Sequence, residues 1–478
     1  MDHFLLSIAI TLAIIIKFLF KYSLAKPKEK LPLAPGTFGW PIIGETIEFL
    51  VSLRYGLVHE FVQKRTKKYK SNVFKTSLLG QNVAIFSGQE ANKFIFNNGN
   101  KLVIGWRPSS IQKLFPSTSF VPIEHDTKRA QNVMSYFLNS QNVDSLISTM
   151  DIMSHLHLEN YWKGKNEVIV YDLVKLFTFS LSTRVFMGIE NSDKILNLYE
   201  KFNIFSRGLL VMDIKFPGTT FYKAMRAGKE LRKEMKAIFE ERRVELQENP
   251  DLPKVDVLTK VITEQDENGK YLTEVEMADK LFGFIVGGYD TTATTITLVM
   301  KYLKEKPEFF NGIMEEQNEI ARNMMPRIVL CWDDIQKMRK TWSFVNEVLR
   351  DTPVVQGLFR EAIEDITYND FLVPKGWKIY LSFGVTQKNG EYFPNPTQFD
   401  PSRFEGNGQL VPYTSAPFGV GHKICPGREF ARILILVFLH NVLKNFQWEA
   451  KDPSEKILWP YFLVPIPTAG YPVTLSTV

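Results

Sequence analysis

One loop near the C-terminus constrains this chain more than any other stretch of its sequence. It covers ten residues, Phe418–Gly427 (FGVGHKICPG), and stands directly before an apolar stretch with helical periodicity. Its glycines allow the backbone to pass close to a flat ligand, and the following helix directs its free amides and positive dipole end towards the sulfur of Cys425. This setting favours a thiolate that holds a metal, although an isolated Cys is more often an inert buried thiol.

Composition places the chain among ordinary globular proteins. Its 58 Lys and Arg residues against 52 Asp and Glu residues give a net charge of +6, which is too small and too evenly spread to predict nucleic-acid binding. With Cys331 and Cys425 as its 2 cysteines, the chain cannot form a disulfide scaffold, and a reducing compartment is favoured. No repeat, low-complexity block or linker follows residue 35, so we expect one large domain.

The N-terminus is the exception to this soluble character. Residues 4–24 are dominated by Leu, Ile, Phe and Ala, and about 20 such residues suffice to cross a bilayer. Because Lys26, Lys28 and Lys30 follow the segment, the positive-inside rule places the body of the protein in the cytosol. A cleaved secretory signal is the alternative, but a basic leading region and a small-x-small cleavage site are both missing. We therefore expect an uncleaved membrane anchor over residues 1–24.

A basic and proline-rich hinge is expected next, over residues 25–44. Its second half, Pro35–Gly44, alternates proline with glycine, which predicts a stiff, non-helical strap between the anchor and the body. The body, residues 45–478, is predicted to be mainly α with a small β portion.

Local patterns place several elements within the body. Residues 73–86 are predicted to form a β-hairpin around Gly80-Gln81-Asn82, and residues 222–246 a charged helix with a narrow apolar stripe. Short strands are expected around Ile366, around Ile379 and in the proline-containing C-terminal segment.

The longest predicted helix carries a second motif. A capping box at Thr273–Glu276 opens it, and its apolar run continues to Tyr302 before Pro307. In its middle stands Gly287-Gly288-Tyr289-Asp290-Thr291. A glycine inside a helix lowers the stability of the helix by about 1 kcal/mol relative to alanine, so we expect some structural or functional gain that explains two adjacent glycines here. A local kink or close helix packing would supply one without any chemistry.

A third motif combines a helix with a distant segment. Glu347 and Arg350 lie three residues apart, on one helix face, and Arg403 follows about fifty residues on in Asp400-Pro401-Ser402-Arg403-Phe404. A second guanidinium could complete a buried triad with this pair. Alone, such a pair is usually a solvated surface ion pair.

The long-helix motif, the E-x-x-R pair, the Pro-x-Arg-Phe segment and the cysteine loop follow one another in the order found in cytochromes P450. The chain resembles that family from the N-terminal segment to the C-terminus, and its Pro-Gly strap is similar to the hinge of microsomal members. The resemblance implies the P450 fold, a single large catalytic domain over residues 45–478, and reductive activation of O2 followed by hydroxylation of a substrate C–H bond.

The resemblance also implies roles for particular residues. Cys425 would be the axial ligand of the iron in haem b, in a loop whose other cofactor-binding residues are Phe418, Gly421, Lys423 and Gly427. Gly287 and Gly288 would leave room for O2, while Asp290 and Thr291 would form the catalytic proton path. Arg360 and Arg129 would bind the haem propionates, with Arg129 as a plain surface charge as the alternative. Glu347, Arg350 and Arg403 would form a structural triad.

Several stretches are similar to plant P450s that oxidise triterpenes, the β-amyrin 28-oxidase type, including Trp106–Ser110, Gln356–Ala362 and Cys425–Arg432. They imply an apolar terpenoid substrate such as β-amyrin, oxidised at C-28, with a taxane, another diterpenoid or a steroid-like hormone as the alternative. The expected substrate pocket contains Trp106, Phe284, Val355, Leu358 and Phe462. The expected partners are NADPH-cytochrome P450 reductase, which supplies electrons, and membrane lipid, with the anchor in the endoplasmic reticulum and no nucleic acid.

Three positions depart from the family pattern. Lys423 stands where Arg is usual, Gln387 where His is usual, and Asp351 where an apolar residue is usual. A lysine can still meet a propionate, but it lacks the two-pronged geometry of a guanidinium. These departures leave open a catalytically impaired haem-binding relative. A haem-thiolate rearrangement enzyme that needs no O2 is a further alternative, although such enzymes often lack the Asp-Thr pair present here.

Overall fold

The computed structural model describes residues 31–119, 131–132, 134–135, 138–139, 142–249, 256–263, 265, 269–406, 411–421 and 424–477. The expected membrane anchor and the first part of the hinge therefore lie outside the described residues. Over the residues just given, no helix combines the length and the apolar character that crossing a membrane requires.

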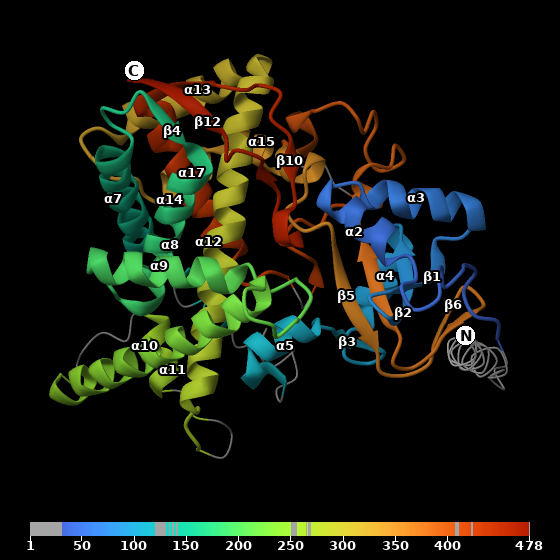
Figure 1. Ribbon diagram of the computed structural model, residues 1–478. Helices are drawn as coiled ribbons and strands as arrows, with labels where there is room; N and C mark the ends of the chain where they lie inside the picture. Colours follow the sequence, from blue (N-terminus) through green and yellow to red (C-terminus); the bar gives the residue numbers. More distant parts are fainter. Residues whose placement is uncertain are drawn as a thin grey trace, which may run out of the picture.

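Helices make up most of the described chain (Figure 1). The α-helices are α2 (Thr46–Arg54), α3 (Val58–Tyr69), α4 (Gln89–Asn97), α5 (Ser109–Leu114), α7 (Val143–Tyr161), α8 (Val170–Met187), α9 (Ser192–Ser206), α10 (Thr220–Glu248), α11 (Val257–Thr263), α12 (Glu274–Glu305), α13 (Pro307–Met324), α14 (Trp332–Lys337), α15 (Arg339–Asp351), α16 (Phe383–Gln387) and α17 (Arg428–Asn445). Short 3-10 helices are η1 (Pro116–Ser119), η2 (Pro401–Phe404) and η4 (Pro460–Phe462).

The strands form small sheets that carry the rest of the regular structure. They are β1 (Val73–Leu78), β2 (Gln81–Ser87), β3 (Val103–Gly105), β4 (Glu167–Ile169), β5 (Gly357–Ala362), β6 (Ile366–Tyr368), β7 (Phe371–Val373), β8 (Lys378–Ser382), β9 (Phe446–Ala450), β10 (Ile457–Leu458), β11 (Ile466–Pro467) and β12 (Pro472–Thr477). The largest sheet has the order β1-β2-β8-β5-β3, and β4-β12-β9 form a second sheet. Within the large sheet, β2 and β8 are parallel and the other neighbours antiparallel. The prediction of a mainly helical protein with a small β portion is confirmed.

The predicted hairpin forms, but its turn lies one to two residues earlier than expected. Leu78 pairs with Gln81, so Leu79 and Gly80 alone make the turn, and Gln81 and Asn82 already belong to β2. Leu79 and Gly80 both have positive φ, 54° and 73°. Two left-handed residues produce the twist that joins antiparallel strands tightly, and this explains why two residues suffice.

The described part of the hinge is tied to the sheets by its backbone. The Lys75 amide donates to the Pro35 carbonyl at 2.8 Å, and the Leu372 amide donates to the Pro32 carbonyl at 2.9 Å. The strap Pro35–Gly44 is non-helical, as predicted, and its first residue is bound to β1, while Pro32 just before the strap is bound to β7.

The predicted long helix is α12, which runs through the centre of the helical part (Figure 1). Thr273 and Glu276 form the predicted capping box, in which the Glu276 carboxylate accepts from the Thr273 amide at 2.8 Å. Pro307 does not only end α12, because it is the first residue of α13, where a missing N–H costs nothing. α12 lies along α8, and most of its residues from Tyr289 to Leu303 are buried in the main core.

The predicted charged helix is α10, which extends the expected range by a few residues at each end. Its apolar stripe is the buried face: Leu231, Met235, Ile238 and Phe239 all belong to the core. Its charged residues lie on the opposite, outer face, as an amphipathic surface helix requires.

Candidate active site

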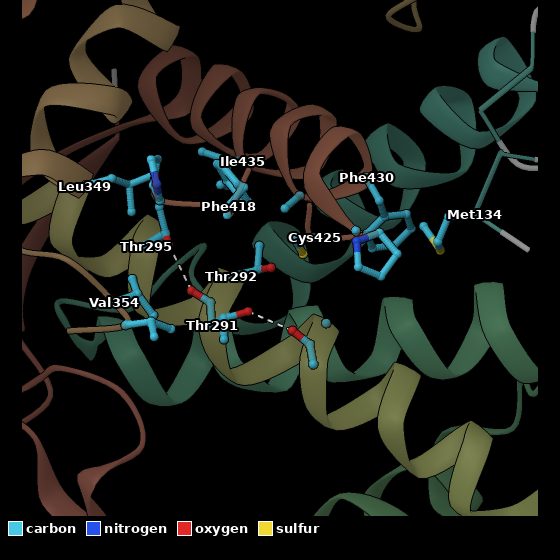
Figure 2. A pocket seen from close by; sticks show the side chains of 18 of the residues that line it. Met134, Thr291, Thr292, Thr295, Leu349, Val354, Phe418, Cys425, Phe430 and Ile435 are labelled. Atoms are coloured by element: carbon cyan, nitrogen blue, oxygen red, sulfur yellow. Dashed lines mark hydrogen bonds between the residues drawn. The ribbon is translucent and has the colours of Figure 1, made fainter. Parts of the chain in front are cut away.

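A single apolar cavity of about 430 Å³ joins the two motifs that carry the predicted chemistry. Cys425, Gly287, Gly288 and Thr291 all line it, and Figure 2 shows Cys425 at the same pocket as Thr291 and Thr292. Apart from Cys425, none of the described residues that line it is ionisable. Its walls consist mainly of apolar side chains: Met134, Phe186, Phe284, Leu349, Val354, Val355, Leu358, Phe383, Phe418, Phe430 and Ile435.

The cysteine loop is closed by its own backbone. The Cys425 amide donates to the Phe418 carbonyl at 2.7 Å, and the Ile424 amide donates to the Gly421 carbonyl at 3.2 Å. Gly419 and Gly421 have φ of 75° and 65°, a left-handed conformation that other residues adopt only with strain. These two glycines therefore fold the loop back on itself so that Cys425 faces the cavity just before α17.

The surroundings of Cys425 affect how readily its thiol ionises. Its side chain is accessible because it faces the cavity, yet protein surrounds it on the other sides. Burial raises the pKa of the Cys425 thiol, and the Gly427 amide only partly opposes this effect. The local setting of the loop therefore does not by itself favour the thiolate, because the burial of the thiol works against that form. A bound cation would reverse this balance, since metal coordination deprotonates a thiol.

The glycine pair of α12 forms the opposite wall of the cavity. No atom lies within 4 Å of the place where a Cβ on Gly287 would stand, so this residue opens directly into free space. The Thr291 hydroxyl donates to the Gly287 carbonyl at 2.7 Å. On Gly288, a Cβ would lie 3.3 Å from the Ser182 hydroxyl oxygen and 3.5 Å from Phe186. The two glycines thus have different surroundings: the first faces the cavity and the second packs on α8.

Asp290 does not face the cavity, although it is adjacent to Thr291 in sequence. Its carboxylate is buried between α12 and α8, where Oδ1 accepts from the Tyr171 hydroxyl at 2.6 Å and lies 3.2 Å from Lys175 Nζ. Burial, followed by the negative charge of Asp290, raises the pKa of the Tyr171 hydroxyl well above its ordinary value. The structure therefore places Thr291 at the cavity but directs Asp290 towards a lysine and a tyrosine that the sequence analysis missed.

The E-x-x-R pair is fully buried. Arg350 donates from Nε and Nη2 to the two carboxylate oxygens of Glu347, at 2.6 and 2.7 Å, and both side chains have 0% exposure. Arg403 Nε lies 3.7 Å from the same carboxylate. The three side chains predicted to form a triad are thus brought together, and none of them lines the cavity.

Two of the three family departures lie in the described chain. Arg350 donates to the backbone carbonyl of Gln387 at 3.0 Å, so this contact does not depend on the side chain at that position, whose Oε1 is buried without a partner among the described residues. Asp351 accepts from the Tyr302 hydroxyl at 2.6 Å and from Lys388. Although burial works against ionisation, Lys388 and Tyr302 hold the pKa of the Asp351 carboxyl below its ordinary value.

The predicted propionate ligands can be judged in part. Arg360 lies in β5, where its Nη1 donates to the Phe359 carbonyl at 2.8 Å. No carboxylate among the residues that the structure describes forms an ion pair with it, and burial lowers its pKa. A half-buried guanidinium without an acidic partner fits an anionic ligand. Arg129 and Lys423, the other two basic residues in the prediction, lie outside the described residues.

The predicted substrate pocket is divided by the structure. Phe284, Val355 and Leu358 line the cavity, whereas Trp106 and Phe462 are not among its lining residues. Trp106 packs edge-on against Phe359 at 5.3 Å. Phe462 lies in the C-terminal segment beside Trp459, to whose carbonyl its amide donates. Both residues were assigned to the pocket because they are aromatic. Apolar character alone does not distinguish residues that line a cavity from residues that pack elsewhere in the core.

Several lining residues were missed by sequence reasoning. Phe186 comes from α8, Thr295 from α12, Leu349 from α15, and Phe430 and Ile435 from α17. Each reads as an ordinary core residue in its helix, and no local signal separates it from its buried neighbours. For Lys175 a signal did exist, because a lysine on an apolar helix at residues 170–187 is unusual unless it is paired.

Comparisons with known proteins agree with this geometry. A family model described as Cytochrome P450 matches residues 34–473. A β-amyrin 28-monooxygenase of Kalopanax septemlobus is 43% identical over 458 residues, covering 96% of this chain and 95% of that protein. A β-amyrin 6-β-monooxygenase of Solanum lycopersicum is 40% identical and covers 100% of both chains. Among solved structures, the retinoic acid-bound cyanobacterial CYP120A1 superposes with a TM-score of 0.81 at 28% identity, covering 94% of this chain and 100% of that one.

The family match extends over the sheets, α12 and the cysteine loop alike, and the sequence similarity to plant enzymes covers nearly the whole chain. The protein therefore belongs to the cytochrome P450 family and is one of its monooxygenases, related to the plant enzymes that oxidise β-amyrin.

Proposed function

We propose that this P450 hydroxylates a pentacyclic triterpene such as β-amyrin, with C-28 as the first position to test, and that Cys425 is the axial ligand of its haem iron. One observation carries the proposal: Cys425 and three residues of α12, Gly287, Gly288 and Thr291, line the same cavity, whose other lining residues are apolar or uncharged. The sulfur is thereby placed where a metal could be held on one side and an apolar substrate on the other.

Family membership implies a haem, and two features of the cavity and one basic residue of β5 fit one. The Cys425 side chain opens into the cavity, and Gly287 leaves free space opposite. Arg360, which is not itself a lining residue, lies in the same strand as the lining residue Leu358 and has a guanidinium that no carboxylate of the described chain neutralises. We assign Arg360 to a propionate. When bound through a thiolate, a haem supplies the reductive activation of O2 and the insertion of one oxygen atom into a C–H bond.

The remaining residues of the site fix the shape of the cysteine loop and place polar groups at the cavity. Phe418, Gly421 and Gly427 shape the cysteine loop, and the fully buried pair of Glu347 and Arg350 fixes the backbone near residues 387–398, to which Arg350 donates. On α12, Thr291 presents its hydroxyl to the cavity while it donates to Gly287. A hydroxyl in this position can still accept a hydrogen bond from water and so help to move protons. Asp290, which lies on the side of α12 that faces α8, would take part in the proton path from outside the cavity.

An apolar wall selects an apolar substrate. Burying a polycyclic hydrocarbon gains about 25 cal/mol per Å² of apolar surface, and a charged substrate would leave its charge unpaired among these side chains. Phe284, Val355 and Leu358 are the lining residues that we assign to the substrate. Two relatives act on β-amyrin, at different positions of the molecule, which supports the substrate class and leaves the position to experiment.

The electrons would come from NADPH through a cytochrome P450 reductase, as is usual for microsomal members of the family. We propose that residues 1–24 anchor the protein in the endoplasmic reticulum membrane, that residues 25–44 link this anchor to the body, and that residues 45–478 form the cytosolic catalytic domain. Of these segments, only residues from 31 onwards are described by the structure.

A single set of assays tests the function. Membranes that contain the full chain and a plant reductase are supplied with NADPH and β-amyrin, and the products are identified by mass spectrometry. We expect an NADPH-dependent hydroxylated triterpene. A product from a diterpene or a steroid, with none from β-amyrin, would show that the substrate is not a triterpene and belongs to that other class. A normal spectrum without turnover on any scaffold would indicate an impaired relative, and a rearranged product without NADPH would indicate an isomerase.

The iron ligand is tested separately by spectroscopy. The reduced protein treated with carbon monoxide should show the red-shifted Soret band of a thiolate-bound haem. Cys425→Ser should abolish this band, whereas Cys331→Ser, which changes the other cysteine, should leave it intact. Persistence of the band in Cys425→Ser would refute the assignment.

A further inference from the structure

A second cavity, of about 330 Å³, lies where the turn after α2, the end of α15, α16 and the segment before η4 meet. It shares a wall with the active-site cavity. Val354 and Val355 of this wall line the active site. Pro353 and Gln356, on either side of them, line the second cavity. No described residue lines both cavities, so the second is a separate space, and its volume falls within the range of about 300–1,000 Å³ that small-molecule sites occupy.

Unlike the active site, the second cavity is lined by charged and polar side chains. Its lining residues with ionisable or hydrogen-bonding groups include Tyr55, His59, Asp351, Gln356, Lys388 and Trp459. Asp351 is one of the three positions that depart from the P450 pattern, in which an apolar residue is usual. The charged wall is therefore a property of this chain and not of the family as a whole, and the proposed hydroxylation does not use it.

Several polar groups of this cavity already have partners. The two carboxylate oxygens of Asp351 accept from Lys388 and from the Tyr302 hydroxyl. The side-chain amide of Gln356 donates to the Leu53 carbonyl at 2.7 Å. A guanidinium also borders the cavity, but it belongs to the buried E-x-x-R pair, and all of its N–H groups have acceptors there. These groups are held by the protein itself and do not require a ligand.

Two donors in the cavity keep bonding capacity that the described chain does not use. The Nε1–H group of Trp459 is buried without an acceptor among the described residues, in a side chain of a residue only 5% exposed. The residue is fixed in place, because its amide donates to the Arg54 carbonyl at 2.9 Å and its ring packs over Gly56. Lys388 has N–H groups beyond the one that it donates to Asp351. A buried indole can only donate, so this group needs an acceptor from outside the described chain.

We propose that the second cavity binds a small aromatic carboxylate, whose oxygens accept from Lys388 and from Trp459 Nε1. A carboxylate supplies acceptors only, which matches the donors that are left over. Its negative charge faces a lysine that a single carboxylate of the protein now neutralises. The rings of Tyr55, His59 and Trp459 line the same cavity and suit a flat apolar ring. This binding involves no oxidation chemistry and does not depend on the proposed function.

Two competing explanations are a cavity that takes a cation, through Asp351, and a cavity that holds only water. Three probes of nearly the same shape separate them: 4-fluorobenzoate is an anion, 4-fluorobenzamide is neutral and 4-fluorobenzylamine is a cation. Fluorine NMR measures the binding of each probe to the haem-loaded, full-length protein. We expect 4-fluorobenzoate to bind with a Kd on the order of 1 mM, and each of the other probes about tenfold more weakly or not at all.

Variants of the lining residues test the assigned contacts. Lys388→Gln removes the charged donor and should weaken the binding of 4-fluorobenzoate about tenfold. Asp351→Asn removes the carboxylate that competes for Lys388 and should tighten binding several-fold. Trp459→Phe keeps an aromatic ring but loses the N–H group, which should weaken binding about fivefold. The carbon monoxide spectrum checks that each variant is folded, and the lysine and aspartate variants decide the matter if Trp459→Phe does not fold.

Lys304 supplies a matched control. It forms an ion pair with Glu449 and is 25% exposed, close to the 23% of Lys388, but it does not line the second cavity. Lys304→Gln should therefore bind 4-fluorobenzoate as the wild type does. A bulky azole that ligates the haem iron supplies a second control, because it fills the active-site cavity and should leave the binding of 4-fluorobenzoate unchanged. Neither control requires turnover, so both remain valid if the proposed triterpene substrate is wrong.

Four results would each overturn the proposal. The first is no binding of 4-fluorobenzoate at concentrations about tenfold above the expected Kd, which would indicate a cavity that holds water. The second is binding of the amide or the amine as tightly as the acid, which would exclude recognition of a carboxylate. The third is equal binding by Lys388→Gln and the wild type, or an equal loss in Lys304→Gln. The fourth is displacement by the azole, which would place the probe in the active-site cavity.

Discussion

Two buried ion pairs, one on α15 and one between α12 and α8, show how differently the same chemistry can be used in one molecule. Arg350 meets both oxygens of Glu347 and also donates to the backbone carbonyls of Gln387, Pro396 and Gln398. Asp290, by contrast, meets Lys175 through one oxygen at 3.2 Å, and Tyr171 shares that oxygen. The first pair is joined through both carboxylate oxygens and several carbonyls, while the second is joined through one carboxylate oxygen.

The difference follows from what surrounds each pair. Charges removed from water are stable only when all their bonding groups are satisfied, and a fully satisfied pair holds its neighbours rigidly. A pair with fewer bonds can rearrange at a lower cost. We therefore expect changes in the α15 pair to affect folding and changes in the α12 pair to affect turnover.

The strongest test of this contrast is Arg350→Leu. It leaves the Glu347 carboxylate buried with Arg403 as its nearest remaining cation, at 3.7 Å. Breaking a buried pair in this way costs about 3–5 kcal/mol, so we expect little folded holoprotein. Urea unfolding and the haem content of purified protein measure the effect. Arg403→Leu, which removes the more distant cation, should cost less, and a stable, haem-loaded Arg350→Leu protein would contradict the contrast.

Asp290→Asn should lower turnover and leave folding unchanged, the opposite of the result expected for Arg350→Leu. The amide keeps the size of the side chain and can still accept from Tyr171, but it cannot exchange a proton at neutral pH. Loss of a group that takes part in proton transfer costs about 100-fold in turnover, which corresponds to about 2.7 kcal/mol in the barrier. The yield of folded protein should remain that of the wild type. Tyr171→Phe, which removes one bond to the same carboxylate, serves as a milder comparison; equal turnover in Asp290→Asn and wild type would exclude a role for the carboxylate.

The glycine pair on α12 allows the same substitution at adjacent positions. Gly287→Ala places a methyl group in open space, so it should stabilise the helix by up to about 1 kcal/mol while it narrows the cavity. Gly288→Ala brings a methyl group to 3.3 Å from the Ser182 oxygen and 3.5 Å from Phe186, and this crowding should cancel the gain. Thermal unfolding of the two variants without substrate gives the comparison. A larger stabilisation by Gly288→Ala would show that α8 and α12 are less tightly packed than described.

The smallest expected effect concerns Asp351 and Lys388, which border the α15 pair. These side chains are 27% and 23% exposed, so their ion pair should contribute about 1 kcal/mol or less. The pKa of Asp351 lies below its ordinary value of 3.8, so its stabilisation is present above that pH and is lost as the pH falls through the lowered value. Asp351→Asn should therefore be less stable than the wild type at neutral pH, with a difference that shrinks in strong acid. A difference that is independent of pH would indicate lost packing instead of lost charge.

Local patterns in the sequence predicted those parts of the protein whose causes are local. The capping box of α12, the β1–β2 hairpin and the spacing of Glu347 and Arg350 depend on residues a few positions apart, and the structure contains all three. The cysteine loop could be placed before α17 for the same reason. The turn of the hairpin was misplaced because Leu79 adopts a left-handed conformation that its side chain does not signal.

The features that sequence reasoning missed depend on contacts between distant segments. The sequence analysis assigned Asp290 and Thr291 to one proton path without saying which of them borders the cavity. Neighbouring residues on a helix point about 100° apart, and the packing of α8 against α12 decides which of the two faces inward. Likewise, whether Trp106 or Phe462 borders the cavity depends on how the segment after β3 and the 3-10 helix η4 are placed in space. The raised pKa of Cys425 depends on burial by several elements, which no local pattern records.

The attachment of residues 31–44 to β1 and β7 has a mechanical consequence. Since the backbone of this segment is hydrogen-bonded at Pro32 and Pro35, a force applied to the chain before residue 31 reaches the strands first. The helices α8 and α12, which carry Lys175 and the glycine pair, are not part of either sheet. A pull on the chain before residue 31 would thus strain the sheets before it changed the spacing between these two helices.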